Sequence, residues 1–215
     1  MMKKSSPEGD SPGGPRSSPL VIVLSGPSGT GKDAILSQLK KSGYPAEFVT
    51  TVTTRPKRAQ EKDGVDYHFI SDERFQEILK RNQFLECAEV YGNRYGVPRE
   101  PVSKALEQGK NVILKVDCQG AATIKKLLPQ AVFIFVVPPS MEELAQRLKG
   151  RRTESDFDCD LRLKTAQEEM KQLPLFDYVV VSRQGKIDLA VLAIEAIIIA
   201  EKHRVNPREI CLPPD

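Results

Sequence analysis

The chain has 215 residues, which is the size of one α/β domain with a small inserted subdomain. Apolar residues make up 40% of the chain, enough for a hydrophobic core, and the net charge of +3 is too small to favour a nucleic-acid or membrane partner. No apolar run is long enough to span a bilayer and no secretory signal is evident, so we expect a cytoplasmic protein.

The first predicted elements are a strand, a glycine-rich loop and a helix. Residues 1–18 are rich in Ser, Pro, Gly and charge and are predicted to form a disordered tail. The apolar run Leu20–Leu24 indicates a strand that is buried on both faces. It continues into Gly26-Pro27-Ser28-Gly29-Thr30-Gly31-Lys32, which fits the P-loop pattern, and then into a helix that ends near Ser42. Backbone N–H groups and the Lys32 ammonium group would bind phosphate there.

A β-rich block follows the first helix. Its β-branched runs, period-two alternation and turn residues predict several short elements. In chain order these are a strand over 48–54 that stops at Pro56, a half-buried strand over 65–70, a helix that begins at Ser71 or Asp72, a strand over 84–90 and a turn over 91–96.

Strands and helices alternate in the remainder of the chain, which implies a parallel sheet with helices on both faces and a ligand at the carboxyl ends of its strands. The predicted helices cover 102–108, 120–128, a segment capped by Ser140 with Glu143 at its third position, a segment ending near Gln172, and 185–202. The predicted strands cover 111–117, 131–137 and 177–182.

The four cysteines are Cys87, Cys118, Cys159 and Cys211, and they lack the spacing of a zinc site or of a disulfide framework. We therefore expect reduced thiols.

The P-loop predicts a nucleoside triphosphate and leaves the second substrate open. Candidate residues for that substrate lie in the β-rich block, where Arg55 and Arg58 are spaced to grip one phosphate through charge-assisted hydrogen bonds. A pair of surface arginines is more often simply solvated, and Glu86 could point to solvent from its strand. Only the pattern of motifs as a whole can decide whether these residues bind a substrate or are simply solvated.

That pattern resembles the guanylate kinase family from about residue 19 to residue 202. The matching stretches are Gly26–Lys32, Thr53–Ala59 with Glu61, Gly64–Phe69, Phe84–Glu86, Gly92–Gly96, Val116–Gly120, Pro138–Ser140, Arg147–Arg151 and Thr153-Glu154.

The resemblance implies an enzyme that transfers the γ-phosphoryl group of ATP to GMP, with Mg²⁺ as cofactor and no nucleic-acid or membrane partner. It implies an α/β fold, with a P-loop NTPase core of a parallel sheet and flanking helices, a β-rich GMP-binding insert and a helical lid. The expected boundaries are 19–203 for the domain, with core segments 19–49, 100–139 and 173–203, a GMP-binding subdomain at 50–99, a lid at 140–172 and a C-terminal tail at 204–215. A monomer or a homodimer is expected.

The resemblance also implies roles for individual residues. The ATP-binding set is Gly26, Pro27, Ser28, Gly29, Thr30, Gly31, Lys32 and Asp33. In the GMP-binding set, Arg55, Arg58, Tyr67 and Tyr95 would hold the phosphate, Thr51 and Glu86 would read the guanine, and Glu61 and Asp117 would lie near the acceptor and the metal. The catalytic set is Lys32, Arg58, Arg147, Arg151 and Arg162, with the last three closing over the transferring phosphoryl group.

Three residues depart from the family pattern. Asp33 replaces the usual Ser or Thr and is our candidate Mg²⁺ ligand; Lys115 replaces an Asp; and Val97 replaces a hydroxyl residue that helps to read guanine. Strand 111–117 should lie beside the P-loop strand, so we expect Asp33 and Lys115 to form a compensating pair.

Two alternatives remain. The Gly-Lys-Asp ending of the P-loop also occurs in ribose 1,5-bisphosphate phosphokinases, although the arginine block and Glu86 argue against that activity. A non-catalytic guanylate kinase-like binding module typically loses the P-loop lysine and the lid arginines, whereas Lys32, Arg147, Arg151 and Arg162 are present here.

Overall fold

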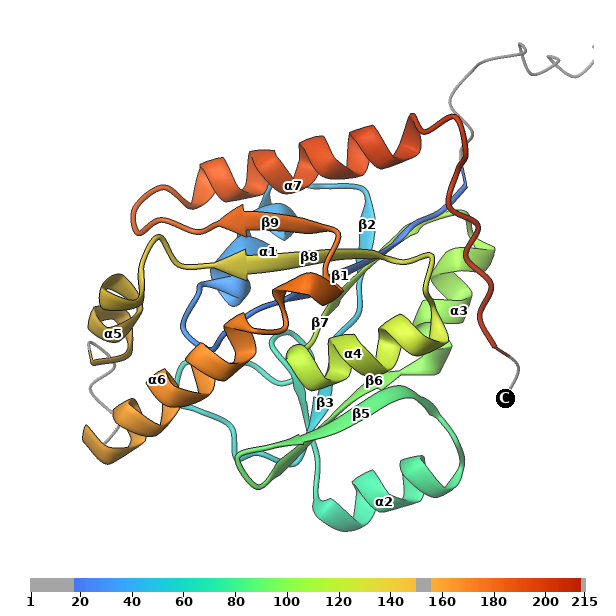
Figure 1. Cartoon of the computed structure of the whole chain (residues 1–215). Helices are drawn as coiled ribbons and strands as arrows, with labels where there is room; N and C mark the ends of the chain where they lie inside the picture. Colours follow the sequence, from blue (N-terminus) through green and yellow to red (C-terminus); the bar gives the residue numbers. More distant parts are fainter. Residues whose placement is uncertain (1–17, 150–155, 214–215) are drawn as a thin grey trace, which may run out of the picture.

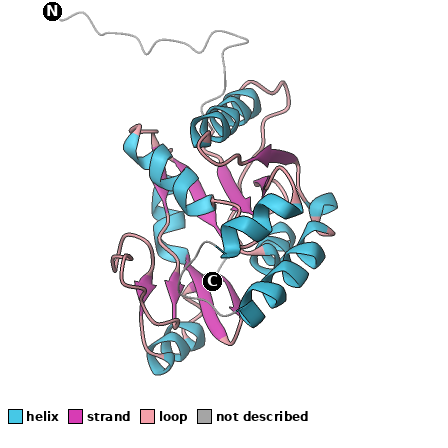
Figure 2. Ribbon diagram, turned by 90° about the vertical axis from the view of Figure 1, so that its left-hand side faces the viewer, coloured by secondary structure: helices cyan, strands magenta, loops and turns pink. Residues whose placement is uncertain are grey.

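The structure is a computed structural model that describes residues 18–149 and 156–213 of the chain. Its centre is a parallel sheet of five strands in the order β2-β7-β1-β8-β9. Helices cover both sides of this sheet, and a second, smaller sheet lies at one end of the molecule (Figures 1 and 2). The strands of the parallel sheet are β1 (Val21–Ser25), β2 (Ala46–Phe48), β7 (Asn111–Lys115), β8 (Val132–Val137) and β9 (Tyr178–Val181).

The central strands are buried on both faces because their apolar side chains alternate between two cores. Val21 and Val23 of β1 face a core shared with α3 (Arg99–Glu107) and α4 (Cys118–Leu127). Ile22 and Leu24 face the opposite core, which is shared with α1 (Lys32–Lys41) and α7 (Ile187–Lys202). Burial of apolar surface on both faces is the main stabilising term for such a layer. The predicted α/β class is confirmed.

The second sheet contains four short strands in the order β4-β3-β6-β5. Its members are β3 (Val52–Thr53), β4 (His68–Phe69), β5 (Phe84–Val90) and β6 (Asn93–Pro98), and α2 (Asp72–Lys80) packs against them. The side chain of Ser71 caps α2, as predicted, and the Phe75 and Phe84 rings lie 4.6 Å apart between the helix and the sheet.

Three predictions for this block are wrong. The turn needs only Tyr91 and Gly92, both with positive φ, so most of the predicted turn over 91–96 belongs to β6. The predicted strand over 48–54 is divided, because β2 pairs with β7 in the large sheet whereas β3 pairs with β6 in the small one. The strand over 65–70 shortens to His68–Phe69.

The remaining helical elements connect the carboxyl end of β8 to the start of β9. They are α5 (Met141–Lys149), α6 (Asp156–Met170) and the 3₁₀ turn η1 (Leu173–Leu175). Leu144 and Leu148 of α5 pack against Ala166 of α6. The charged stretch 150–155 lies outside the described residues, as do residues 1–17 of the tail predicted over 1–18.

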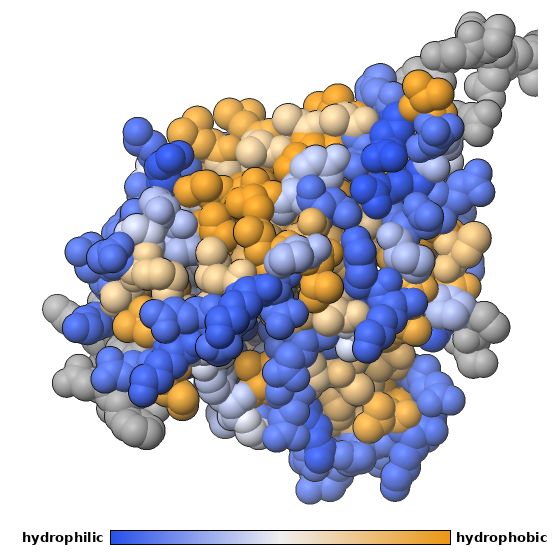
Figure 3. Space-filling model, viewed as in Figure 1, coloured by the Kyte–Doolittle hydropathy of each residue, from blue (hydrophilic) through white to orange (hydrophobic). Residues whose placement is uncertain are grey.

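The surface differs from one element to the next. Apolar residues gather over β9 and α7, while hydrophilic residues cover α6 (Figure 3). None of the described helices is long and apolar enough to cross a membrane. Cys87, Cys118 and Cys211 are free thiols, as expected, and the Cys159 side chain lies outside the described part.

Candidate active site

The P-loop connects β1 to α1 at the carboxyl end of the central strand. Gly26 has φ +136°, and a β-carbon there would lie 2.1 Å from the carbonyl oxygen of Val136 in β8. Only glycine fits this approach. Gly31 precedes α1 with φ +93° and provides no side-chain cap, so the first N–H groups of the helix are available to a phosphate.

Lys32 folds back over this loop. Its Nζ donates to the carbonyl oxygens of Gly26 and Pro27, the latter at 3.0 Å. Burial lowers the pKa of Lys32, while the charges of Glu169 in α6 and Asp33 oppose that effect. Burial raises the pKa of the Glu169 carboxyl in turn, with the charge of Lys32 acting against it. The amine of Lys32 and the carboxyl group of Glu169 thus interact electrostatically at the phosphate-binding loop.

Asp33 and Lys115 form the ion pair that the sequence predicts. Lys115 is the last residue of β7 and lies beside Leu24 of β1, so its side chain reaches the start of α1. Its Nζ lies 2.6 Å from Oδ1 of Asp33. Burial disfavours the charge on Lys115, but the adjacent Asp33 carboxylate and Tyr67 outweigh burial and raise the pKa of the amine.

The donor set at the P-loop fits a metal ion that is held mainly by phosphate. No group of three or more His, Cys, Asp or Glu side chains within residues 18–149 and 156–213 could hold a metal by itself. The Asp33 side chain is 72% exposed and provides one carboxylate beside the loop. Mg²⁺ bound through one protein carboxylate together with substrate phosphates is a common arrangement.

Arginine and aromatic side chains converge next to Lys115, and we call Arg55, Glu61, Tyr67 and Tyr95 the acceptor cluster. Glu61 accepts a hydrogen bond from Nη2 of Arg55 at 2.7 Å and another from the backbone N–H of Arg58 at 2.8 Å. The Tyr67 ring lies 5.9 Å from the Tyr95 ring and 5.5 Å from Cζ of Arg55. Glu61 therefore orients the arginine segment, a role that the sequence did not predict for it.

Thr51, Glu86 and Asp117 lie deeper in the same region. Glu86 is only 5% exposed, and its Oε1 has no hydrogen-bond partner within the described residues. Burial and the nearby negative charge of Asp117 raise the pKa of Glu86 to about 8. The Thr51 hydroxyl donates to the carbonyl oxygen of Lys115 at 3.2 Å, and Asp117 caps α4. Val97, which departs from the family pattern, packs in the apolar core.

The predicted lid arginines lie in different places. Arg147 donates to the carbonyl oxygen of Thr30 in the P-loop at 3.3 Å and to that of Ser182 at 2.6 Å. Oε1 of Glu143 forms an ion pair with Nη2 of the same guanidinium at 2.5 Å. Arg162 lies against Tyr91 in the turn between β5 and β6, with Cζ 5.7 Å from the ring centroid. Arg151 lies outside the described residues.

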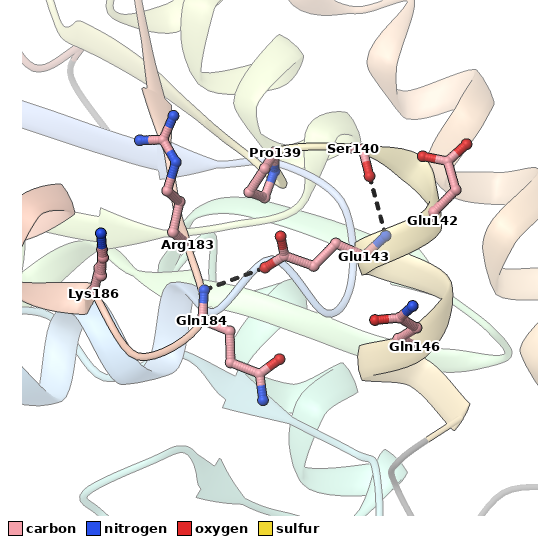
Figure 4. A pocket seen from close by; sticks show the side chains of 8 residues that line it. All are labelled: Pro139, Ser140, Glu142, Glu143, Gln146, Arg183, Gln184 and Lys186. Carbon is pink, nitrogen blue, oxygen red and sulfur yellow. Dashed lines mark hydrogen bonds between the residues drawn. The ribbon is translucent and has the colours of Figure 1, made fainter.

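A pocket of about 430 Å³ opens beside the P-loop, between the start of α5 and the loop after β9 (Figure 4). Its polar lining includes Glu142, Gln146, Arg183 and Lys186. Across it, the carboxylate of Glu143 accepts a hydrogen bond from the backbone N–H of Gln184 at 3.2 Å. The pocket is large enough for a nucleoside group.

Sequence reasoning missed Glu169 and most of the lining of this pocket, Arg183 and Lys186 among it. The four-residue spacing of Glu143 and Arg147 could have indicated their ion pair on α5. No local pattern distinguishes Glu169 or Arg183 from the many exposed charged residues of the chain, because their place depends on how α6 and β9 pack.

Comparisons with known proteins point to one family. The sequence model of the family described as guanylate kinase matches residues 18–201. Guanylate kinase 2, chloroplastic/mitochondrial, of Oryza sativa subsp. japonica is 42% identical over 197 residues, covering 91% of this chain and 69% of that protein. Guanylate kinase of Caldanaerobacter subterraneus subsp. tengcongensis is 46% identical over 187 residues, covering 87% of this chain and 90% of that protein. The crystal structure of guanylate kinase from Anaplasma phagocytophilum matches with a TM-score of 0.72 and 32% sequence identity, covering 88% of this chain and 89% of that one.

Proposed function

The chain belongs to the guanylate kinase family, and from that premise we propose that it transfers the γ-phosphoryl group of ATP to GMP, giving ADP and GDP. The observation that carries this assignment is the Glu86 carboxylate, which is buried and has an oxygen without a partner among the described residues. Guanine presents an N1–H and a 2-amino group side by side, so one carboxylate can accept both donors. Adenine presents no such pair and would leave the carboxylate buried and unpaired.

The donor nucleotide takes the P-loop side of the site. The backbone of Gly26–Asp33 and the Lys32 ammonium group would bind the β- and γ-phosphates. The pocket between α5 and Arg183 lies next to the loop and would receive the adenosine part of ATP.

The acceptor nucleotide takes the opposite side. Arg55, Arg58, Tyr67 and Tyr95 would hold the GMP phosphate, and Glu61 keeps the two arginines oriented through its carboxylate. Thr51 and Glu86 would read the base, and Asp117 lies near them.

The reaction needs positioning and charge more than covalent chemistry. An oxygen of the GMP phosphate attacks the γ-phosphorus of ATP, and the bond from that phosphorus to the oxygen bridging the β- and γ-phosphates breaks. The nucleophile is already an anion, so no general base is needed. Mg²⁺ bound with ATP would neutralise phosphate charge, with Asp33 offering one oxygen ligand.

The proposal includes the subdomain at 50–99 and the lid at 140–172, whose arginines Arg147, Arg151 and Arg162 would close on the phosphates and exclude water. We place the activity in purine nucleotide metabolism in the cytoplasm, carried out by a monomer or homodimer without nucleic-acid or membrane partners.

A coupled assay of ADP release tests the function with GMP, AMP and ribose 1,5-bisphosphate as acceptors. We expect rapid turnover with GMP, and turnover with AMP lower by about a hundredfold or more because two hydrogen bonds to a charged group are lost. Turnover with ribose 1,5-bisphosphate alone would favour the phosphokinase alternative. Binding of GMP without turnover would favour a binding module.

A further inference from the structure

We propose that Lys115 is a further catalytic residue of this chain, whose ammonium group contacts the phosphate of the acceptor nucleotide. This inference rests on the proposed function. It assigns a direct role to a residue at which the chain departs from the family pattern.

The position of the amine carries the proposal. Nζ of Lys115 lies 2.6 Å from Oδ1 of Asp33, which directly follows the P-loop lysine. The same Nζ lies 4.0 Å from the centroid of the Tyr67 ring in the acceptor cluster. One ammonium group therefore bridges the element that holds the donor phosphates and the cluster proposed to hold the acceptor phosphate.

The backbone of Lys115 is held in place by strand pairing and by a hydrogen bond. β7 pairs in parallel with β1, with Lys115 beside Leu24. The carbonyl oxygen of Lys115 accepts a hydrogen bond from the Thr51 hydroxyl at 3.2 Å. Because Thr51 is on the base side of the proposed acceptor site, this bond joins that side to the end of β7, from which the Lys115 side chain extends.

The surroundings favour a contact with phosphate. An ammonium group has three donors; Asp33 accepts one of them and Tyr67 interacts with another, so one donor is left for a phosphate oxygen. The Lys115 side chain is only 11% exposed, and an ionic contact is worth more in such a partly dehydrated site than in water. Tyr67, which lies next to this amine, also lies next to Arg55, whose Cζ is 5.5 Å from the centroid of the Tyr67 ring. Arg55 therefore places a second cation in the same cluster.

A simpler explanation is that Lys115 only neutralises Asp33. The two explanations differ when both residues are replaced together, which is the logic of a double-mutant cycle. If neutralisation is the only role, the double variant Asp33→Ser with Lys115→Met has no unpaired charge and binds GMP as the wild type does. If Lys115 contacts the acceptor phosphate, the double variant keeps the defect of Lys115→Met.

The experiment measures GMP affinity by calorimetry without ATP or Mg²⁺, and then turnover with both substrates. The variants are Lys115→Met, Lys115→Gln, Asp33→Ser and the Asp33→Ser/Lys115→Met double variant. Lys110→Met is the matched control, because Lys110 is exposed and directly precedes the opposite end of the same strand. Thermal unfolding identifies folded variants, and Lys115→Gln provides a polar replacement if the methionine variant does not fold.

We expect Lys115→Met and the double variant to bind GMP about ten- to a hundredfold more weakly than the wild type, with guanosine binding unchanged because guanosine lacks the phosphate. Wild-type GMP affinity in the double variant, or equal weakening for guanosine and GMP, would overturn the proposal. A wild-type chain that binds GMP through its phosphate yet transfers no phosphoryl group would contradict the proposed function and leave the Lys115 contact supported.

Discussion

The carboxylate of Glu86 lies directly against Gly120, so that a β-carbon on Gly120 would be 2.6 Å from Oε1 of Glu86. Gly120 is in the first turn of α4, where its N–H donates to the Asp117 side chain at 2.9 Å. The absence of a side chain at this point leaves the space in which the Glu86 carboxylate is buried.

Gly120→Ala should therefore reduce guanine binding while leaving the fold intact. Alanine favours a helix over glycine by up to about 1 kcal/mol, so unfolding should not become easier. The added methyl group forces the carboxylate aside, and a displacement of about 1 Å can cost up to about a hundredfold in catalysis. Steady-state kinetics should show a raised KM for GMP and an unchanged KM for ATP. Thr123→Ala, on the exposed face of α4, is the control.

The pKa of Glu86 predicts how stability depends on pH. Burial first and Asp117 second raise this pKa from 4.5 to about 8. Between these values the folded chain retains a proton that the unfolded chain releases, so stability falls as pH rises, by up to about 1.4 kcal/mol per pH unit. Glu86→Gln does not titrate and should gain stability relative to the wild type as pH rises from about 5 to about 8.

Urea unfolding at both pH values measures this difference, with Glu107→Gln on the exposed face of α3 as the control. The same carboxyl must lose its proton to accept two hydrogen bonds from guanine, so GMP affinity should increase toward pH 8 and binding should release a proton to the buffer. A pH-independent GMP affinity would argue against the assignment of Glu86 to the base.

Much of this architecture could be predicted from local signals. The β-branched run over Leu20–Leu24 and the glycines after it predict a buried strand and a phosphate loop, because both depend on short-range backbone preferences. The Asp33–Lys115 pair also followed from the sequence, since the alternating pattern places β7 beside β1.

The remaining features depend on contacts that no local pattern encodes. The chain from Phe48 to Thr53 has uniform strand propensity, and only packing decides that it leaves one sheet at Phe48 and joins another at Val52. Likewise, the electrostatic interaction of Glu169 with the P-loop lysine arises from the way α6 packs.

Lys32→Met should abolish most activity without unfolding the protein. The amine is partly buried over the loop and donates to Pro27, and no other side chain in the P-loop carries a positive charge. Removing one such preorganised donor from a phosphate site typically costs about a hundredfold or more in kcat. Circular dichroism should match the wild type. Lys41→Met, at the exposed end of the same helix, should keep normal turnover, and similar kinetics for both variants would contradict the P-loop mechanism.

The segment after α7 was predicted to be a tail, yet it is anchored to the core. Arg208 donates to both carboxylate oxygens of Glu201, at 2.7 Å and 3.1 Å, and to the carbonyl oxygen of Ala131. The Glu201 side chain has no exposed surface, and the Tyr178 hydroxyl donates to it at 2.5 Å. Ile210 and Leu212 pack on the core of β1 and α4.

Arg208→Met should destabilise the protein by about 3 kcal/mol, because it removes from the buried Glu201 carboxylate the cation that donates to both of its oxygens. Burial opposes ionisation of Glu201, but hydrogen bonds from Arg208 and Tyr178 outweigh burial and lower its pKa. The pair therefore stabilises the fold above about pH 4.5, and its contribution is lost as pH falls through the lowered pKa. Urea unfolding at neutral pH measures this loss of stability in Arg208→Met.

Arg204→Met is the control, because Arg204 is 48% exposed and 3.7 Å from the same carboxylate, so a loss of stability of less than about 1 kcal/mol is expected. Equal effects of the two variants would mean that the segment is not anchored through Arg208.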